Sequence, residues 1–163
     1  MYPLLHSPAT YGRARLLVVA TADDLPVFGR IIAAAGCQGL RTFVLCPVAG
    51  LPLAGAGLTR AYLPAAQERA LRAAGAPLGA YRLDVTGFCT TPELHDLVSA
   101  HVDRVRPDRV VTRLDAALPG VRRAAHRPAA TLLLRRGDLV DLDGRPVADP
   151  WTLRPTHHTK EAS

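Results

Sequence analysis

The chain has 163 residues, of which 48% are hydrophobic and 21% charged, and its formal net charge is +6 at pH 7. This balance is typical of one globular domain and excludes a disordered chain. It also argues against a membrane protein, because the longest apolar runs fall far short of the ~20 residues that span a bilayer.

The first predicted elements are a strand and the helix that follows it. The run Arg15-Leu-Leu-Val-Val-Ala20 is apolar throughout, as in a strand of a parallel sheet that is buried on both faces. Apolar residues at helical spacing predict a helix over 25–36, and Gly36 favours its end. Residues 1–13 show no period and are expected to form an extended arm.

The middle of the chain continues the alternation of strands and helices. We expect a strand at 41–46, a Gly- and Pro-rich loop at 47–59, a helix at 64–74 and a strand at 80–85. The loop follows the carboxyl end of a strand, so it is either a solvated connector or a lid over a site. Thr-Thr-Pro-Glu at 90–93 is a strong helix-start signal.

The last part of the chain predicts a strand at 109–112, a short Arg-rich helix at 119–126 and a strand at 131–135. Turn signals on both sides of 139–142 predict a hairpin at the sheet edge. The fold class is therefore α/β, a three-layer sandwich with a mostly parallel, Rossmann-like sheet and a C-terminal hairpin. We expect one domain over 1–155 and a flexible tail over 156–163.

Cysteine usage and charge narrow the function classes. Cys37, Cys46 and Cys89 are widely spaced, which argues against a disulfide framework and a zinc knuckle. Cys46 is expected to be a small buried side chain, whereas Cys89 is either an inert loop residue or a nucleophile. All basic residues except Lys160 are arginines, scattered without a nucleic-acid motif, so no nucleic-acid partner is expected. The N-terminus lacks the pattern of a signal peptide, which predicts a cytoplasmic protein.

Asp23 and Asp24 follow the first predicted strand directly. Ligands of open α/β sheets bind beyond the carboxyl ends of the strands, so this is the favoured position for a site. One interpretation is structural: Asp24 in the first turn of a helix, with Thr21 as the N-cap. The other is a retained site, because two adjacent carboxylates repel each other and capping does not explain Asp23.

Four stretches together resemble the zinc-dependent de-N-acetylases of the PIG-L (LmbE-like) superfamily, over roughly residues 14–130. That family opens with a strand that ends in Ala-His-Pro-Asp-Asp-Glu, where this chain has Ala-Thr-Ala-Asp-Asp-Leu at 20–25. The other similar stretches are the Arg/Glu-rich helix at 67–74 with Leu-Gly at 78–79, Arg-Pro-Asp-Arg-Val-Val-Thr at 106–112, and Arg-Arg-Ala-Ala-His at 122–126.

The resemblance implies a role for four positions. Asp23 matches the general base, and Asp24 matches a zinc ligand that would be vestigial here. The family's two histidine ligands are matched by Thr21 and Val121. A catalytic zinc needs about three protein ligands, so no cofactor is expected unless other residues rebuild the set. The histidines that we considered for such a rebuilt zinc site are His95, His126, His157 and His158, whereas His101, on an apolar helical stripe, is expected to be a packed core residue.

Two functions follow from the resemblance. The first is a degenerate homologue that acts as a binding or partner subunit, for instance beside an active enzyme in specialised metabolism. The chain looks short against the family, which would leave a sheet edge for a protein partner or a second copy. The second is an active hydrolase on a small amide or amino sugar, with Asp23 as base and Arg69, Arg113, Arg122 or Arg123 as the anchor of an anionic substrate group. A receiver-like or nucleotide-binding domain is disfavoured, because no Gly-rich phosphate loop follows the first strand.

Overall fold

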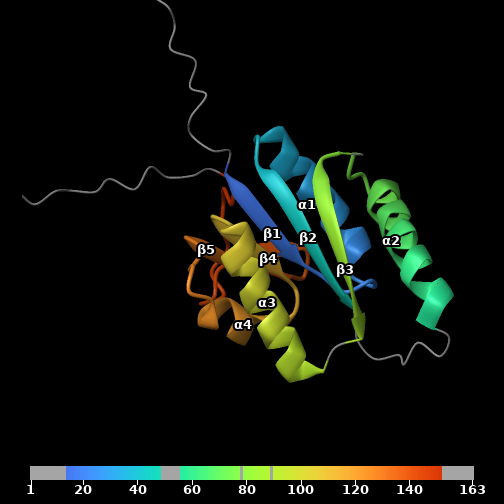
Figure 1. Ribbon diagram of the computed structural model, residues 1–163. Helices are drawn as coiled ribbons and strands as arrows, with labels where there is room; N and C mark the ends of the chain where they lie inside the picture. The colour runs from blue at the N-terminus through green and yellow to red at the C-terminus, as the bar shows by residue number, and fades with distance from the viewer. Residues whose placement is uncertain (1–13, 49–55, 78, 89, 152–163) are drawn as a thin grey trace, which may run out of the picture.

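The computed structural model describes residues 14–48, 56–77, 79–88 and 90–151. These residues form a six-stranded sheet in the order β3-β2-β1-β4-β5-β6, with helices on both faces (Figure 1). Strands β1 to β5 are parallel, and β6 pairs with β5 antiparallel. The elements are β1 (Arg15–Val19), α1 (Leu25–Cys37), β2 (Arg41–Val48), α2 (Ala56–Ala73), β3 (Tyr81–Phe88), α3 (Thr91–Val105), β4 (Arg109–Thr112), the 3₁₀ turn η1 (Asp115–Ala117), α4 (Leu118–Arg123), β5 (Ala130–Arg135) and β6 (Asp138–Val140).

This topology confirms the predicted α/β fold with a Rossmann-like sheet and a C-terminal hairpin. The chain winds outward from β1 to β3, then returns through α3 to place β4 on the other side of β1. β1 therefore pairs with both β2 and β4. The strand order reverses between β1 and β4, and such a switch point is where open α/β sheets place their ligands.

Alternating side chains of β1 belong to two separate hydrophobic clusters. Leu16 and Val18 pack with Phe28 of α1 and Leu71 of α2. Leu17 and Val19 belong to the second cluster, together with Val98 and Val102 of α3 and Val121 of α4. Residues 16–19 of β1 are fully buried, which is the pattern of a strand covered on both faces. The helices thus form one layer of α1 and α2 and another of α3 and α4.

Several element bounds differ from the sequence-based expectations. α2 begins at Ala56, inside the predicted loop at 47–59, and it continues through Pro64, where the sequence predicts its start. α4 ends at Arg123 and does not reach His126. Residues 49–55 of the predicted loop, the arm at 1–13 and the tail at 156–163 lie outside the described residues.

Two local predictions on cap and core are confirmed. α3 begins with a capping box, in which the Thr90 amide donates to Glu93 Oε2 at 2.6 Å. Cys46 is fully buried, and burial raises the pKa of its thiol to about 11, so it is protonated at neutral pH. Cys37 is exposed, and Cys89 is not among the described residues.

In the ranges that the structure describes, no helix is both long and apolar enough to cross a membrane.

Candidate functional site

The turn between β1 and α1 lies at the carboxyl edge of the sheet. Its backbone is closed by the amides of Asp24 and Leu25, which both donate to the Thr21 carbonyl, at 3.0 and 3.1 Å. The residue at the N-cap position of α1 is therefore Asp24, and the expectation that Thr21 occupies it is wrong. The physical reason is that residues 22–24 form a turn before the helix begins.

The Asp24 carboxylate does not cap the helix. One of its oxygens, Oδ2, accepts a hydrogen bond from the Thr21 hydroxyl at 3.2 Å. The other, Oδ1, pairs with Arg113 Nη1 at 3.2 Å, from the segment that follows β4. The Asp24 side chain is only 18% exposed, whereas that of Arg113 is 48% exposed. The carboxylate is thus held on both oxygens, and the guanidinium still faces solvent.

Thr112, the last residue of β4, fixes the relative position of the two strand ends. Its hydroxyl donates to the Val19 carbonyl at 2.8 Å and accepts from the Leu114 amide at 3.0 Å. Thr112 is fully buried. These two bonds join β1 to the backbone on the far side of Arg113, and they hold that arginine beside Asp24. The sequence predicts only a strand at Thr112 and not its bond to β1, because Val19 lies 93 positions away in the chain.

Asp23 is exposed in the same turn. Its side chain makes no hydrogen bond or ion pair with any other residue that the structure describes. The two adjacent carboxylates therefore differ: Asp24 is bonded to Thr21 and Arg113, whereas Asp23 is exposed and has no partner in the described part of the chain.

The other predicted anchor arginines do not join this turn. Arg122 and Arg123 are exposed on α4, and Arg123 pairs with Asp96 of α3. Arg69 is exposed on α2, in the helical layer on the other face of the sheet. Val121 is 4% exposed and packs in the core, so its position offers no donor to the crevice. Of the four predicted arginines, only Arg113 lies at the site.

The predicted histidines that the structure describes lie elsewhere. The amide of His126 donates to Asp103, and its ring lies 3.4 Å from the Pro107 carbonyl. His95 belongs to α3, and 157–158 are outside the described residues. Among the residues described, no three His, Cys, Asp or Glu side chains are grouped as metal ligands. A hydroxyl, a carboxylate already paired with a guanidinium, and a buried valine are not a zinc donor set.

A second polar cluster, which the sequence reasoning missed, joins α3 to β3. His101 is 7% exposed, as expected for a packed histidine, but its Nε2 lies 2.8 Å from Asp84 Oδ2. Its Nδ1 lies 2.9 Å from the Leu97 carbonyl. Arg104, one turn further along α3, reaches the same Asp84 oxygen at 3.1 Å. The hydrogen bond with His101, assisted by that with Arg104, lowers the pKa of Asp84 against the opposing effect of partial burial.

Asp84 makes stability depend on acid pH in a defined direction. A carboxyl group with a lowered pKa in the folded state adds stability above its unfolded pKa and loses it as pH falls through the folded value. Substitution D84N should therefore destabilise the protein at pH 7, and its effect should shrink as the pH falls below about 4. Urea unfolding at several pH values measures this difference. Asp138, exposed and without a side-chain partner among the described residues, supplies the control D138N. An effect of D84N that does not change with pH would contradict the lowered pKa of Asp84 as its cause.

The fold and the site together define a class: a Rossmann-like α/β domain with a carboxylate–arginine pair at its topological switch point. Among solved structures, it is similar to the conserved protein TT1542 from Thermus thermophilus, with a TM-score of 0.51 and 21% identity. The match covers 75% of this chain and 66% of that protein, so the chain spans slightly under two thirds of its relative. At this identity the likeness concerns the fold.

Two further structures are more distant. GalB, the 4-carboxy-2-hydroxymuconate hydratase from Pseudomonas putida, matches at a TM-score of 0.46 and 15% identity, over 75% of this chain and 64% of GalB. A universal stress protein in complex with cAMP matches at 0.44 and 16% identity, over 76% of this chain and 99% of its own. A scan against protein-family models found no match, and a search of curated proteins found none either.

Proposed function

We propose that the protein is a degenerate homologue of the PIG-L-like de-N-acetylases that acts in the cytoplasm as a binding or partner subunit. One observation carries the proposal: the carboxylate that matches a zinc ligand, Asp24, is paired with Arg113 and hydrogen-bonded to Thr21. A guanidinium beside Asp24 already neutralises the charge that would attract a divalent cation. The resemblance supports the family, and this pairing supports the loss of its metal chemistry.

The position of the pair supports a binding role. Arg113 is about half exposed at the switch point, and Asp23 is exposed in the neighbouring turn. A ligand or a partner side chain can therefore accept hydrogen bonds from the Arg113 guanidinium and donate one to the Asp23 carboxylate at the same edge of the sheet. In the described sheet β3 is an edge strand that pairs only with β2, and such an edge offers backbone groups to a protein partner or a second copy.

The exposed carboxylate of Asp23 also favours the second candidate function, an active hydrolase that uses Asp23 as general base. The two functions differ in what a metal does. In the hydrolase, added zinc would bind through Asp24 and support release of acetate from a small amide. In the partner subunit, zinc would neither bind with one-to-one stoichiometry nor confer activity.

Zinc binding and deacetylation, measured on one preparation, separate these functions. We expect no stoichiometric zinc by metal analysis after dialysis against zinc, and no acetate release from N-acetylglucosamine. We also expect D23N and D24N to leave both readouts unchanged. Acetate release that requires zinc and is abolished by D23N would overturn the proposal in favour of the hydrolase.

A further inference from the structure

The amino-terminal half of the sheet carries a row of arginines that the site at the switch point does not use. Arg15 of β1 is the pairing partner of Arg41 of β2, and Phe43 pairs with both Leu17 of β1 and Arg82 of β3. Side chains alternate along each strand, so these residues project from one face of the sheet. Leu17 identifies that face as the α3 side, because it packs in the cluster with α3 and α4.

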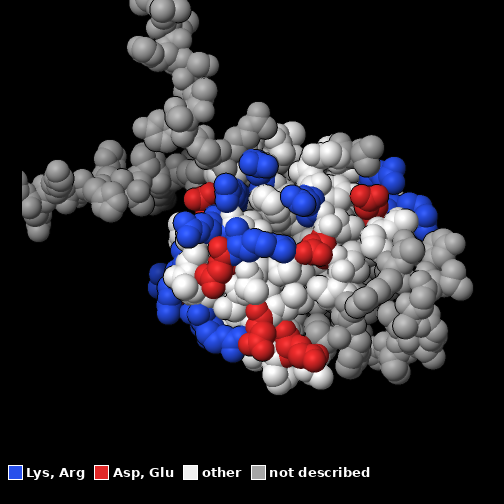
Figure 2. All heavy atoms as spheres, viewed as in Figure 1, with Lys and Arg blue, Asp and Glu red and all other residues white. Residues whose placement is uncertain are grey.

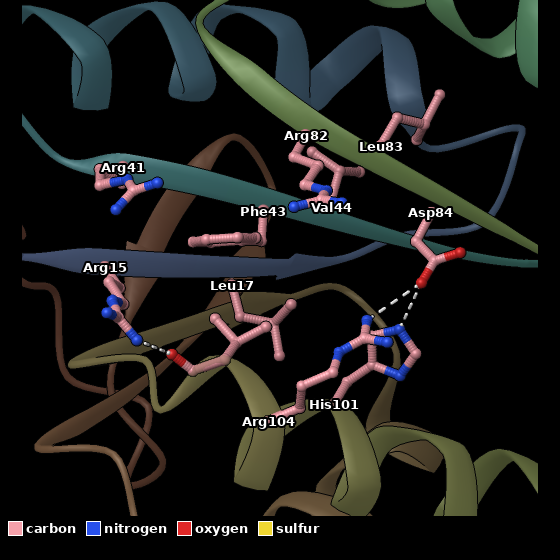
Figure 3. Close-up of a pocket in the computed structure, with 11 residues that line it drawn as sticks. Arg15, Leu17, Arg41, Phe43, Val44, Arg82, Leu83, Asp84, His101 and Arg104 are labelled. Atoms are coloured by element: carbon pink, nitrogen blue, oxygen red, sulfur yellow. Dashed lines mark hydrogen bonds and ion pairs between the residues drawn. The ribbon is translucent and has the colours of Figure 1, made fainter.

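These residues line a cavity of about 470 Å³ between the sheet and α3 (Figure 3). In the space-filling view, basic side chains gather over β1, β2 and β3 on this face (Figure 2). The lining that the structure describes also includes Asp84, His101 and Arg104. None of these residues belongs to the turn that holds Asp24, so the cavity is a separate site. Its volume is in the range of small-molecule sites.

The charges in the cavity are unbalanced. Of the lining residues that the structure describes, four are arginines and one, Asp84, is a carboxylate. Arg104 is paired with Asp84, and Arg15 Nη1 donates to the Val105 carbonyl at 2.8 Å. Within the described ranges, the guanidiniums of Arg41 and Arg82 have no hydrogen-bond or ion-pair partner. Arg15 and Arg41 face each other across neighbouring strands, an arrangement of like charges that an anion would relieve.

The cavity also contains an apolar surface. In Figure 3, Phe43 lies between the side chains of Arg41 and Arg82, with Leu17 below it. Phe43 is half-buried, and it extends from the sheet at the centre of the arginine row. A ligand that met both features would place an anionic group on the guanidiniums and a flat apolar body on the phenyl ring.

We propose that this cavity, the Arg41–Arg82 groove, binds a small organic phosphate monoester. Its phosphoryl oxygens would accept hydrogen bonds from Arg41 and Arg82, and its apolar or aromatic body would lie on Phe43. Guanidiniums match phosphate oxygens in geometry, and a phosphate monoester carries close to two negative charges at neutral pH. A single carboxylate would neutralise less of the charge of this groove. The Asp84–His101 hydrogen bond joins β3 to α3 at one end of the cavity (Figure 3).

Binding of phenyl phosphate and AMP, followed by amide chemical shifts of the full chain, tests the proposal. We expect both compounds to shift the signals of residues 41–44 and 82–84. Benzoate and phenol have no phosphoryl group, and inorganic phosphate has no aromatic body. Each of the three should therefore bind more weakly. The double variant R41Q/R82Q should weaken phenyl phosphate binding at least about tenfold, since each removes a charge-assisted hydrogen bond.

A matched control distinguishes binding in the groove from attraction of an anion to any basic surface. R127Q/R145Q removes the same charge from exposed arginines outside the cavity and should leave the affinity within about twofold. The proposal is overturned if neither compound shifts the groove signals, or if both double variants weaken binding equally. Binding of benzoate as tight as that of phenyl phosphate would overturn the assignment to phosphate. Because Asp24 and Arg113 are unchanged in these variants, the outcome is independent of the proposed function.

Discussion

Replacement of Phe28 by alanine is expected to lower the free energy of unfolding by about 3–5 kcal/mol. Phe28, on α1, is the largest of the fully buried side chains among the described residues. It packs in the cluster that joins α1 to Leu16 and Val18 of the central strand. The truncation leaves a cavity that the surrounding strand, paired on both sides, cannot collapse to fill.

Chemical denaturation, followed by circular dichroism, measures this loss. The control is V27A, at the adjacent position of the same helix, where the side chain is 41% exposed. This control should change the free energy of unfolding by no more than about 0.5 kcal/mol. Equal effects of the two substitutions would show that α1 does not pack on the sheet through the face that carries Phe28.

The sequence predicted the fold well where the physics is local. A fully apolar run predicted β1, and helical spacing of apolar residues predicted α1, because both patterns follow from burial of a single element. The rule that proline starts helices misplaced the beginning of α2, which continues through Pro64. The order of the strands depends on how separate elements pack, and no local pattern encodes it.

The candidate site was predictable only in part, for the same reason. Asp23 and Asp24 could be placed at the carboxyl edge of the sheet, because they follow the strand in sequence. The pairing of Asp24 with Arg113 joins residues 89 positions apart, and it exists only because β4 returns to lie beside β1. The contact between Asp84 and His101 likewise needs α3 to fold back over the sheet. Position along one element was available from sequence, and contact between elements was not.

The hydroxyl of Thr112 links β4 to β1 at the switch point. It donates to a β1 carbonyl, that of Val19, and accepts from the amide of Leu114, and Thr112 itself is fully buried. Substitution T112V keeps the shape but leaves one buried acceptor and one donor without this partner. We therefore expect a loss of about 2–3 kcal/mol in the free energy of unfolding.

The chain offers a matched control for this substitution. Thr42 of β2 is also a buried threonine in the sheet, 4% exposed, but its hydroxyl has no hydrogen-bond partner among the described residues. T42V removes an unsatisfied polar group and should leave the stability unchanged or increase it. Urea unfolding of the two variants therefore compares the same chemical change at two buried sites, with opposite expected results. A similar loss in both would mean that threonine packing, and not the bonds of Thr112, holds β1 and β4 together at the Asp24–Arg113 pair.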